Sequence, residues 1–294
     1  MDRARIEAVV QAVLREISGS IDVAGASPPL REAPGGLHID LSDPTALENR
    51  RRPGIAHPND AEGLRALMAS TSARIGVGRA GPRYRTGSLL LFQADHAVTQ
   101  DALMRDVDPG LLEELGLFSV QTQVSDRETY LLRPDLGRLL SPEARTTIEE
   151  RCTKAPQVQL VVGDGLSAAA IEANLREILP VLMQGLQSAG LSIGTPFFVR
   201  FARVGLMNDI NTIIDAQVIV LLIGERPGLG RAESMSAYLG FQPRPESTDA
   251  DRNVICNIFD GGTNPLEAGA AVVQLVQEMI AHQTSGVKLK MATA

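Results

Sequence analysis

The stretch QVIVLLIGERPGLG, residues 217–230, combines a buried strand with a glycine-rich loop. Its apolar run, Val218 to Ile223, is too short for an ordinary helix and is rich in β-branched side chains, which is typical of a strand buried on both faces. Gly224 ends the run, and a tight loop follows. In open α/β sheets, ligands bind at the loops beyond the carboxyl ends of the strands. Glu225 and Arg226 are therefore candidate ligand-binding residues, placed among glycines that let a ligand approach the backbone.

The second half of the chain continues this alternation of strands and helices. Apolar runs predict further strands over residues 158–162, 196–204 and 254–259, with a GDGLS loop directly after the first of them. Helical patterns lie between and after these strands, over residues 168–189, 209–216 and from 264 onward. Strands separated by helices form parallel βαβ units with right-handed crossovers. We therefore expect residues 141–294 to form a Rossmann-like, doubly wound and mostly parallel sheet.

The first half of the chain has a different character. Residues 2–17 carry apolar side chains at helical spacing, and a segment rich in Pro, Gly, Ser and Ala follows. Residues 1–60 are therefore predicted to be an amphipathic helix plus a flexible linker. Residues 61–140 show short helical patterns and are predicted to form a small helical domain, with a brief strand at Tyr130–Leu132. The amphipathic helix is expected to dock either on its own protein or on a separate partner.

Composition excludes several classes of protein. The chain has 294 residues and a net charge of −7, which disfavours a general role in nucleic-acid binding. No apolar run is long enough to span a membrane, and charged residues interrupt the N-terminal apolar stretch, so no signal peptide is predicted. Cys152 and Cys256 have no metal-ligand spacing and are interpreted as free thiols in a reducing cytoplasm. No metal site is predicted.

The motifs for catalysis by this chain alone are missing. The sequence contains neither GxSxG nor HExxH. Gly228-Leu229-Gly230 begins like a dinucleotide fingerprint but lacks its third glycine, and it follows a late strand. Three arginines, Arg79, Arg83 and Arg85, lie between glycines and a proline. They are interpreted as contacts to a phosphate or an acidic partner, or alternatively as partners of the chain's own carboxylates. A ligand-binding domain without catalytic residues of its own is the prediction.

From about Glu62 to Val287, the chain resembles the small (light) subunit of ethanolamine ammonia-lyase. The resemblance depends on many separate motifs that occur in family order. These motifs are GRAGPR, ADH (94–96), YLLRPDLGR, DGLS, EILP, GTPFFVR, IGERPGLG, ADR (250–252) and GGT (261–263). So many motifs at compatible spacing are far more specific than one glycine-rich loop.

The resemblance implies a function in a two-subunit enzyme. Enzymes of this family convert ethanolamine to acetaldehyde and ammonia by radical chemistry that depends on adenosylcobalamin. It further implies that the large subunit holds the substrate, that the small subunit closes over the corrinoid, and that the heterodimers form a larger multimer. The implied location is the bacterial cytoplasm. The N-terminal segment is similar to peptides that direct cargo into ethanolamine-utilisation microcompartments.

The resemblance also assigns cofactor-binding residues. The family's cobalamin contacts fall on Val204, Glu225 and Val254, where Val254 replaces a residue that can be Cys in the family. Glu225 is expected to accept hydrogen bonds from amide side chains of the corrin or of the nucleotide tail. No DxHxxG motif occurs in the sequence, so cobalamin is expected to keep its own base on cobalt. Without the resemblance, core packing would be the expected role of both valines.

Two further functions compete with this one. A stand-alone nucleotide-dependent enzyme is disfavoured by the incomplete fingerprint and by the absence of an acid/base pair. A scaffold or assembly protein of a microcompartment is compatible with the amphipathic N-terminus alone.

Overall fold

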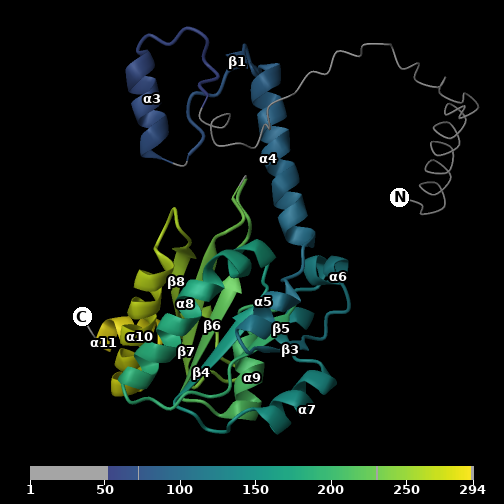
Figure 1. Cartoon of the computed structure of the whole chain (residues 1–294), viewed down its shortest axis with the longest axis vertical. Coiled ribbons are helices and arrows are strands. Elements are labelled where there is room, and N and C mark those ends of the chain that lie inside the picture. The colour runs from purple at the N-terminus through teal and green to yellow at the C-terminus, as the bar shows by residue number, and fades with distance from the viewer. Residues whose placement is uncertain (1–51, 72, 230, 293–294) are drawn as a thin grey trace, which may run out of the picture. The chain divides into compact units, whose positions relative to one another are not determined.

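The computed structural model describes residues 52–71, 73–229 and 231–292 of the chain (Figure 1). The amphipathic helix predicted over residues 2–17, and most of the predicted linker, lie outside the described residues. The described residues all belong to one unit, Asp43–Ala294.

A six-stranded sheet forms the centre of the described part of the chain, with the strand order β3-β5-β4-β6-β7-β8. The first four strands in this order are parallel. β7 is antiparallel to β6, and β8 is antiparallel to β7. The predicted mostly parallel α/β fold is thus confirmed. The strands span Phe118–Gln121 (β3), Val158–Gly163 (β4), Phe197–Arg200 (β5), Val218–Gly224 (β6), Met235–Phe241 (β7) and Arg252–Ile258 (β8).

Helices lie on both faces of this sheet because the chain reverses its direction across it. From β4 the chain passes through α8 to β5, and from β5 it passes through α9 back across β4 to β6. Right-handed crossovers in opposite directions place their helices on opposite faces. α8 (Ala168–Ser188) and α10 (Pro265–His282) share one core with Leu160 of β4. α7 (Pro142–Arg151) and α9 (Leu206–Ile214) share the other core with Val161.

The central strand β6 is buried along its whole length, as its sequence predicts. The residues Val218, Val220 and Leu222 belong to the α8/α10 core, whereas Ile219 and Leu221 belong to the α7/α9 core. All five side chains are inaccessible to solvent. Full burial of one such side chain stabilises the fold by roughly 1.5–3 kcal/mol. The loop that follows β6 is therefore fixed in position by two hydrophobic cores.

Three details of the predicted secondary structure are wrong. β7 was not predicted, and because of it the last two strands are antiparallel. Its sequence MSAYLGF contains Ser236 and Gly240, so pairing with its neighbours outweighs a weak local preference. β3 lies within the segment predicted to be helical and pairs with β5. The predicted strand at Tyr130–Leu132 is instead part of a helix, because the Asp126 carboxylate caps that helix by accepting a hydrogen bond from Thr129 N (2.8 Å).

The other described elements surround the sheet or precede it. The helical patterns around Leu64, Leu89 and Leu111 are confirmed as α3, α4 and α5. α3 has no buried residue, and α4 buries only Asp95 and Ala102. The remaining bounds are Ala61–Ser70 (α3), Arg79–Ala80 (β1), Arg83–Tyr84 (β2), Thr86–Met104 (α4), Pro109–Glu114 (α5), Arg127–Leu132 (α6), Leu136–Arg138 (η1), Asp249–Asp251 (η2) and Gly286–Ala292 (α11).

Candidate functional site

One face of the two outer strands is open. Tyr238 of β7 is paired directly with Val254 of β8, so their side chains point to the same face of the sheet. Tyr238 packs against the α7/α9 core, but Val254 is 47% exposed. On the opposite face, α10 contacts both strands, and Ala237 and Leu239 are buried. The α7/α9 layer thus ends before the sheet does, and a ligand or another protein can reach this face.

A pocket of about 790 Å³ lies at this open face. Its walls come from the loop after β5, the first turn of α9, η1 and the outer strands. Both valines assigned by resemblance, Val204 and Val254, line it, although they come from different segments of the fold. The lining residues are Pro134, Arg138, Leu139, Arg203, Val204, Gly205, Asn208, Asp209, Tyr238, Pro245, Ser247, Thr248, Asp249, Arg252 and Val254.

Glu225, the third assigned residue, does not line this pocket. Its carboxylate accepts hydrogen bonds from the Ser234 hydroxyl (2.7 Å), from the Ser236 hydroxyl and from Asn257 N (2.9 Å). Burial and the nearby Glu225 carboxylate both raise the pKa of Tyr238, which does line the pocket. Glu225 therefore lies next to the pocket and links β7 to β8, the two strands that form part of its wall.

The β8 strand is irregular where it binds Glu225. The register between β7 and β8 shifts between Met235 and Ala237. Asn257 has a positive φ of 61°, which a non-glycine residue rarely adopts. A bulge of this kind turns a backbone group away from the ladder. Here the Asn257 N–H donates to Glu225 and not to the neighbouring strand.

The other side of the pocket depends on a second carboxylate, Asp164 of the GDGLS loop. Asp164 is buried, and its Oδ1 accepts a hydrogen bond from Ala202 N (2.9 Å) in the loop after β5. Its Oδ2 lies 3.5 Å from a guanidinium nitrogen of Arg127. Burial raises the pKa of Asp164 to about 6, against the opposing effect of the Ala202 N–H and Arg127. The residue preceding Ala202, Phe201, has a positive φ of 59°, so this carboxylate stabilises an unusual turn.

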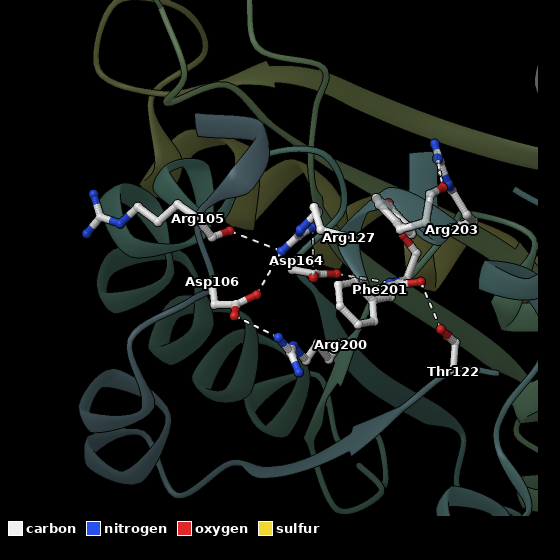
Figure 2. Close-up of polar contacts among 10 residues, drawn as sticks. Arg105, Asp106, Thr122, Arg127, Asp164, Arg200, Phe201 and Arg203 are labelled. Carbon is white, nitrogen blue, oxygen red and sulfur yellow. Dashed lines mark hydrogen bonds and ion pairs between the residues drawn. The ribbon is translucent and has the colours of Figure 1, made fainter. Parts of the chain in front are cut away.

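Arg127 is held in place from several directions, as Figure 2 shows. It bonds to Asp106 (2.9 Å) and to the carbonyl oxygen of Arg105 (3.0 Å) as well as pairing with Asp164. Asp106 also accepts a hydrogen bond from Arg200 (2.7 Å), and the Arg127 guanidinium lies 4.9 Å from the Phe201 ring centroid. The network connects α6, the end of α4 and β5.

Tyr130 completes the support of this turn. Its hydroxyl, which is buried, donates to Ala202 O (2.7 Å), and burial raises the pKa of Tyr130. The guanidinium of Arg203 stacks on the Tyr130 ring at 4.1 Å and donates to Tyr130 O (2.8 Å). Both backbone polar groups of Ala202 are thus bonded to side chains, and Arg203 and Val204 are directed to the pocket.

The two glycine-rich loops contact each other. Leu166 N donates to Gly224 O (3.1 Å), and a Cβ at Gly224 would come within 2.1 Å of Ser167 O. These glycines permit two loops of the same chain to pack closely, whereas the sequence led us to expect that they admit a ligand. Arg226, the other candidate from this stretch, is exposed and does not line the pocket.

Sequence reasoning missed Asp164 as a functional residue. The available signal was its position, because Gly163-Asp164 and Gly224-Glu225 each end a buried parallel strand with a carboxylate. Arg138 and Arg203 were missed as well, since no local pattern distinguishes them from surface arginines.

The predicted arginine cluster forms a small hairpin, β1–β2. Arg79 stacks on the Tyr84 ring at 4.4 Å and donates to Pro82 O (3.2 Å). Within the described part of the chain, Arg79, Arg83 and Arg85 form no ion pair with a carboxylate, so the alternative that they neutralise the chain's own acids receives no support there.

Cys152 is buried and Cys256 is exposed, and both are free. Over the described ranges, no group of three or more His, Cys, Asp or Glu side chains is placed to hold a metal ion. None of the helices within these described ranges is long and apolar enough to cross a bilayer.

Comparison with known families gives a match over most of the chain. Residues 61–290 match the family described as "Ethanolamine ammonia-lyase light chain (EutC)". This range includes the pocket, both carboxylate networks and all three residues assigned from the resemblance. The protein therefore belongs to the ethanolamine ammonia-lyase light chain family.

Proposed function

We propose that this chain is the corrinoid-clamping small subunit of an adenosylcobalamin-dependent ethanolamine ammonia-lyase. Family membership supports a lyase in which a light chain works with a large subunit. The observation that carries the finer proposal is that Val204 and Val254, the two valines assigned by resemblance, line one pocket. Glu225 lies directly behind the same wall. Two positions far apart in sequence thus line one open pocket, and the third supports its wall.

The chemistry of this surface is compatible with part of a corrinoid. Val204, Val254 and the Tyr238 ring offer apolar contacts to the edge of a macrocycle. Asn208 and Thr248 provide polar groups close to its amide side chains. A corrinoid is larger than a pocket of about 790 Å³, so this chain would cover one part and the large subunit would cover the rest.

In this proposal the cofactor supplies the organic radical chemistry, and the residues of this chain position it. Asp164 and Glu225 hold the two walls, Val204 and Val254 contact the corrinoid, and the closed interface excludes water from reactive species. No catalytic residue is assigned to this chain. The acid, base and substrate contacts belong to the large subunit, in a multimer of heterodimers.

Two further parts of the proposal concern the cofactor's state and the location of the enzyme. We propose that cobalamin binds base-on, because the sequence lacks DxHxxG. An EPR spectrum of the holoenzyme that shows histidine nitrogen on cobalt would refute this. We also propose a bacterial cytoplasmic location, with the N-terminal segment addressing a microcompartment in hosts that make one. A fusion of residues 1–20 to a fluorescent protein that stays diffuse in such a host would refute the second part.

The direct test is ammonia-lyase activity of the large subunit with adenosylcobalamin and ethanolamine, measured with and without this chain. We expect activity only when both chains are present. Activity that does not depend on this chain would contradict the proposal and favour the scaffold function. A titration of the same complex with NAD(P)H tests the nucleotide-dependent alternative, for which we expect no binding.

A further inference from the structure

The pocket carries more positive charge than its own carboxylates neutralise. Three arginines line it, Arg138, Arg203 and Arg252, together with two carboxylates, Asp209 and Asp249. Asp249 forms its ion pair with Arg252. Asp209 is the remaining carboxylate of the lining that could neutralise Arg138 or Arg203.

Asp209 has partners other than these two arginines. Its carboxylate pairs with Arg145 of α7 and accepts a hydrogen bond from Leu140 N (2.8 Å). Within the part of the chain that the structure describes, Arg138 and Arg203 form no ion pair with any carboxylate. Two guanidinium groups with uncompensated charge thus face one pocket.

These two arginines lie on either side of the start of α9. Arg203 is stacked on Tyr130 and comes just before Gly205, the N-cap of α9. Arg138 passes close to the same glycine, because a Cβ at Gly205 would come within 3.2 Å of the Arg138 side chain. No side chain caps this end of α9. The positive end of the helix dipole therefore adds to the field of the two arginines.

We propose that Arg138 and Arg203 bind the phosphodiester of the cobalamin nucleotide tail. This inference rests on the proposed function and deepens it, because it says which end of the cofactor lies where. The side chains of the corrin are neutral amides, and the phosphodiester is the anionic group of the tail. Guanidinium groups match phosphate oxygens in geometry and in charge. The tail would lie against the start of α9, with the corrin toward Val254.

The test compares two corrinoids in the complex of this chain with the large subunit. Cyanocobalamin contains the phosphodiester, whereas dicyanocobinamide lacks the nucleotide tail. For Arg138→Gln and Arg203→Gln we expect the affinity for cyanocobalamin to fall about tenfold or more, and the affinity for dicyanocobinamide to stay within about twofold of wild type. Arg203→Lys keeps the charge and is expected to recover part of the loss.

Arg133→Gln is the matched control. Arg133 is exposed, comes from the same stretch of chain as Arg138, and pairs with Asp135 outside the pocket. This variant should bind both corrinoids as wild type does. Raising the salt concentration should weaken cyanocobalamin binding in the wild-type complex more than in Arg138→Gln, because screening acts on the charge that this variant lacks.

The possible results of these binding experiments distinguish a failure of the phosphodiester site from a failure of the proposed function. Equal losses for both corrinoids would mean that the arginines only support the fold, and no loss for either would mean that the phosphodiester lies elsewhere. Either result overturns the inference while leaving the proposed function standing. A wild-type complex that binds neither corrinoid would overturn the proposed function and the inference with it.

Discussion

Asp164 and Glu225 occupy equivalent places in the fold, yet they differ in burial and in what they hold. Each follows a glycine at the end of a central parallel strand, β4 or β6. Asp164 is almost fully buried and fixes the turn that leads to Val204. Glu225 is half-buried and fixes the bulge in the strand that carries Val254. One repeated strand–glycine–carboxylate pattern thus positions both walls of one pocket.

The difference follows from what covers each carboxylate. The loop after β5, together with Tyr130, covers Asp164, so its charge is desolvated and needs Arg127. The open face of β7 and β8 leaves Glu225 partly accessible, and two serine hydroxyls and one backbone N–H suffice as its partners. We therefore expect Asp164 to contribute more to the stability of the whole fold, and Glu225 to contribute more to the local stability of the β7–β8 edge.

The largest expected effect is that of Asp164→Ala. The substitution leaves Ala202 N–H without its acceptor and removes one partner of the largely buried Arg127 guanidinium. Breaking a buried pair in this way costs about 3–5 kcal/mol. Chemical denaturation of the purified chain measures this loss in the free energy of unfolding. A loss below about 1 kcal/mol would show that water replaces the carboxylate and that the site is not tightly packed.

The second prediction concerns pH and uses Asp164→Asn. Because the pKa of Asp164 is raised from 3.8 to about 6 in the folded protein, the folded state holds its proton more tightly than the unfolded state. This contribution to stability is full below about pH 4 and is lost as the pH rises through 6, a change of about 3 kcal/mol. The unfolding free energy of wild type minus that of Asp164→Asn should therefore fall by about 3 kcal/mol from pH 4 to pH 7. A constant difference would contradict the raised pKa.

The third prediction concerns Glu225→Ala. The buried Ser236 hydroxyl and the Asn257 N–H lose their acceptor, which we expect to cost about 1–3 kcal/mol. Hydrogen exchange should become faster at the β7–β8 edge and stay unchanged in β4. Faster exchange throughout the sheet would mean that Glu225 stabilises the core and not the edge. In the two-chain complex, the same variant should also weaken cobalamin binding.

The smallest effect is expected for Tyr130→Phe. The variant keeps the aromatic ring under Arg203 but removes the hydrogen bond to Ala202 O, which we expect to cost about 1–1.5 kcal/mol. Thermal unfolding measures the change. If Tyr130→Phe were as damaging as Asp164→Ala, the hydrogen bond to the carbonyl of Ala202 would anchor the turn as strongly as the one from its N–H, which contradicts this ranking.

How much of this the sequence predicts depends on whether the signal is local. β6 was predictable because its apolar run is itself the signal, and α3, α4 and α5 follow from helical spacing. β7 was not, because its sequence becomes a strand only through pairing with β6 and β8. The resemblance supplied Val204, Glu225 and Val254 as contacts to one cofactor, but no local sequence pattern indicated that the two valines line a pocket.

The supporting network was also beyond local patterns. Arg127 and Asp164 are far apart in the chain and meet only because α6 packs against the loops that follow β4 and β5. The uncompensated charge of Arg138 and Arg203 becomes visible only once the partners of Asp209 and Asp249 are known. The net charge of a pocket depends on which ion pairs form in the folded protein, so it cannot be predicted from the amino-acid composition.

The most direct test of the account places a bulky side chain on the open wall. Val254→Trp changes an exposed residue, so folding and large-subunit binding should survive, whereas cyanocobalamin affinity of the two-chain complex should fall about tenfold or more. Val287→Trp is the control, because Val287 is a similarly exposed valine (57% against 47%) in α11 that does not line the pocket. We expect loss of affinity for Val254→Trp alone. Wild-type affinity in Val254→Trp, measured by equilibrium dialysis, would contradict it.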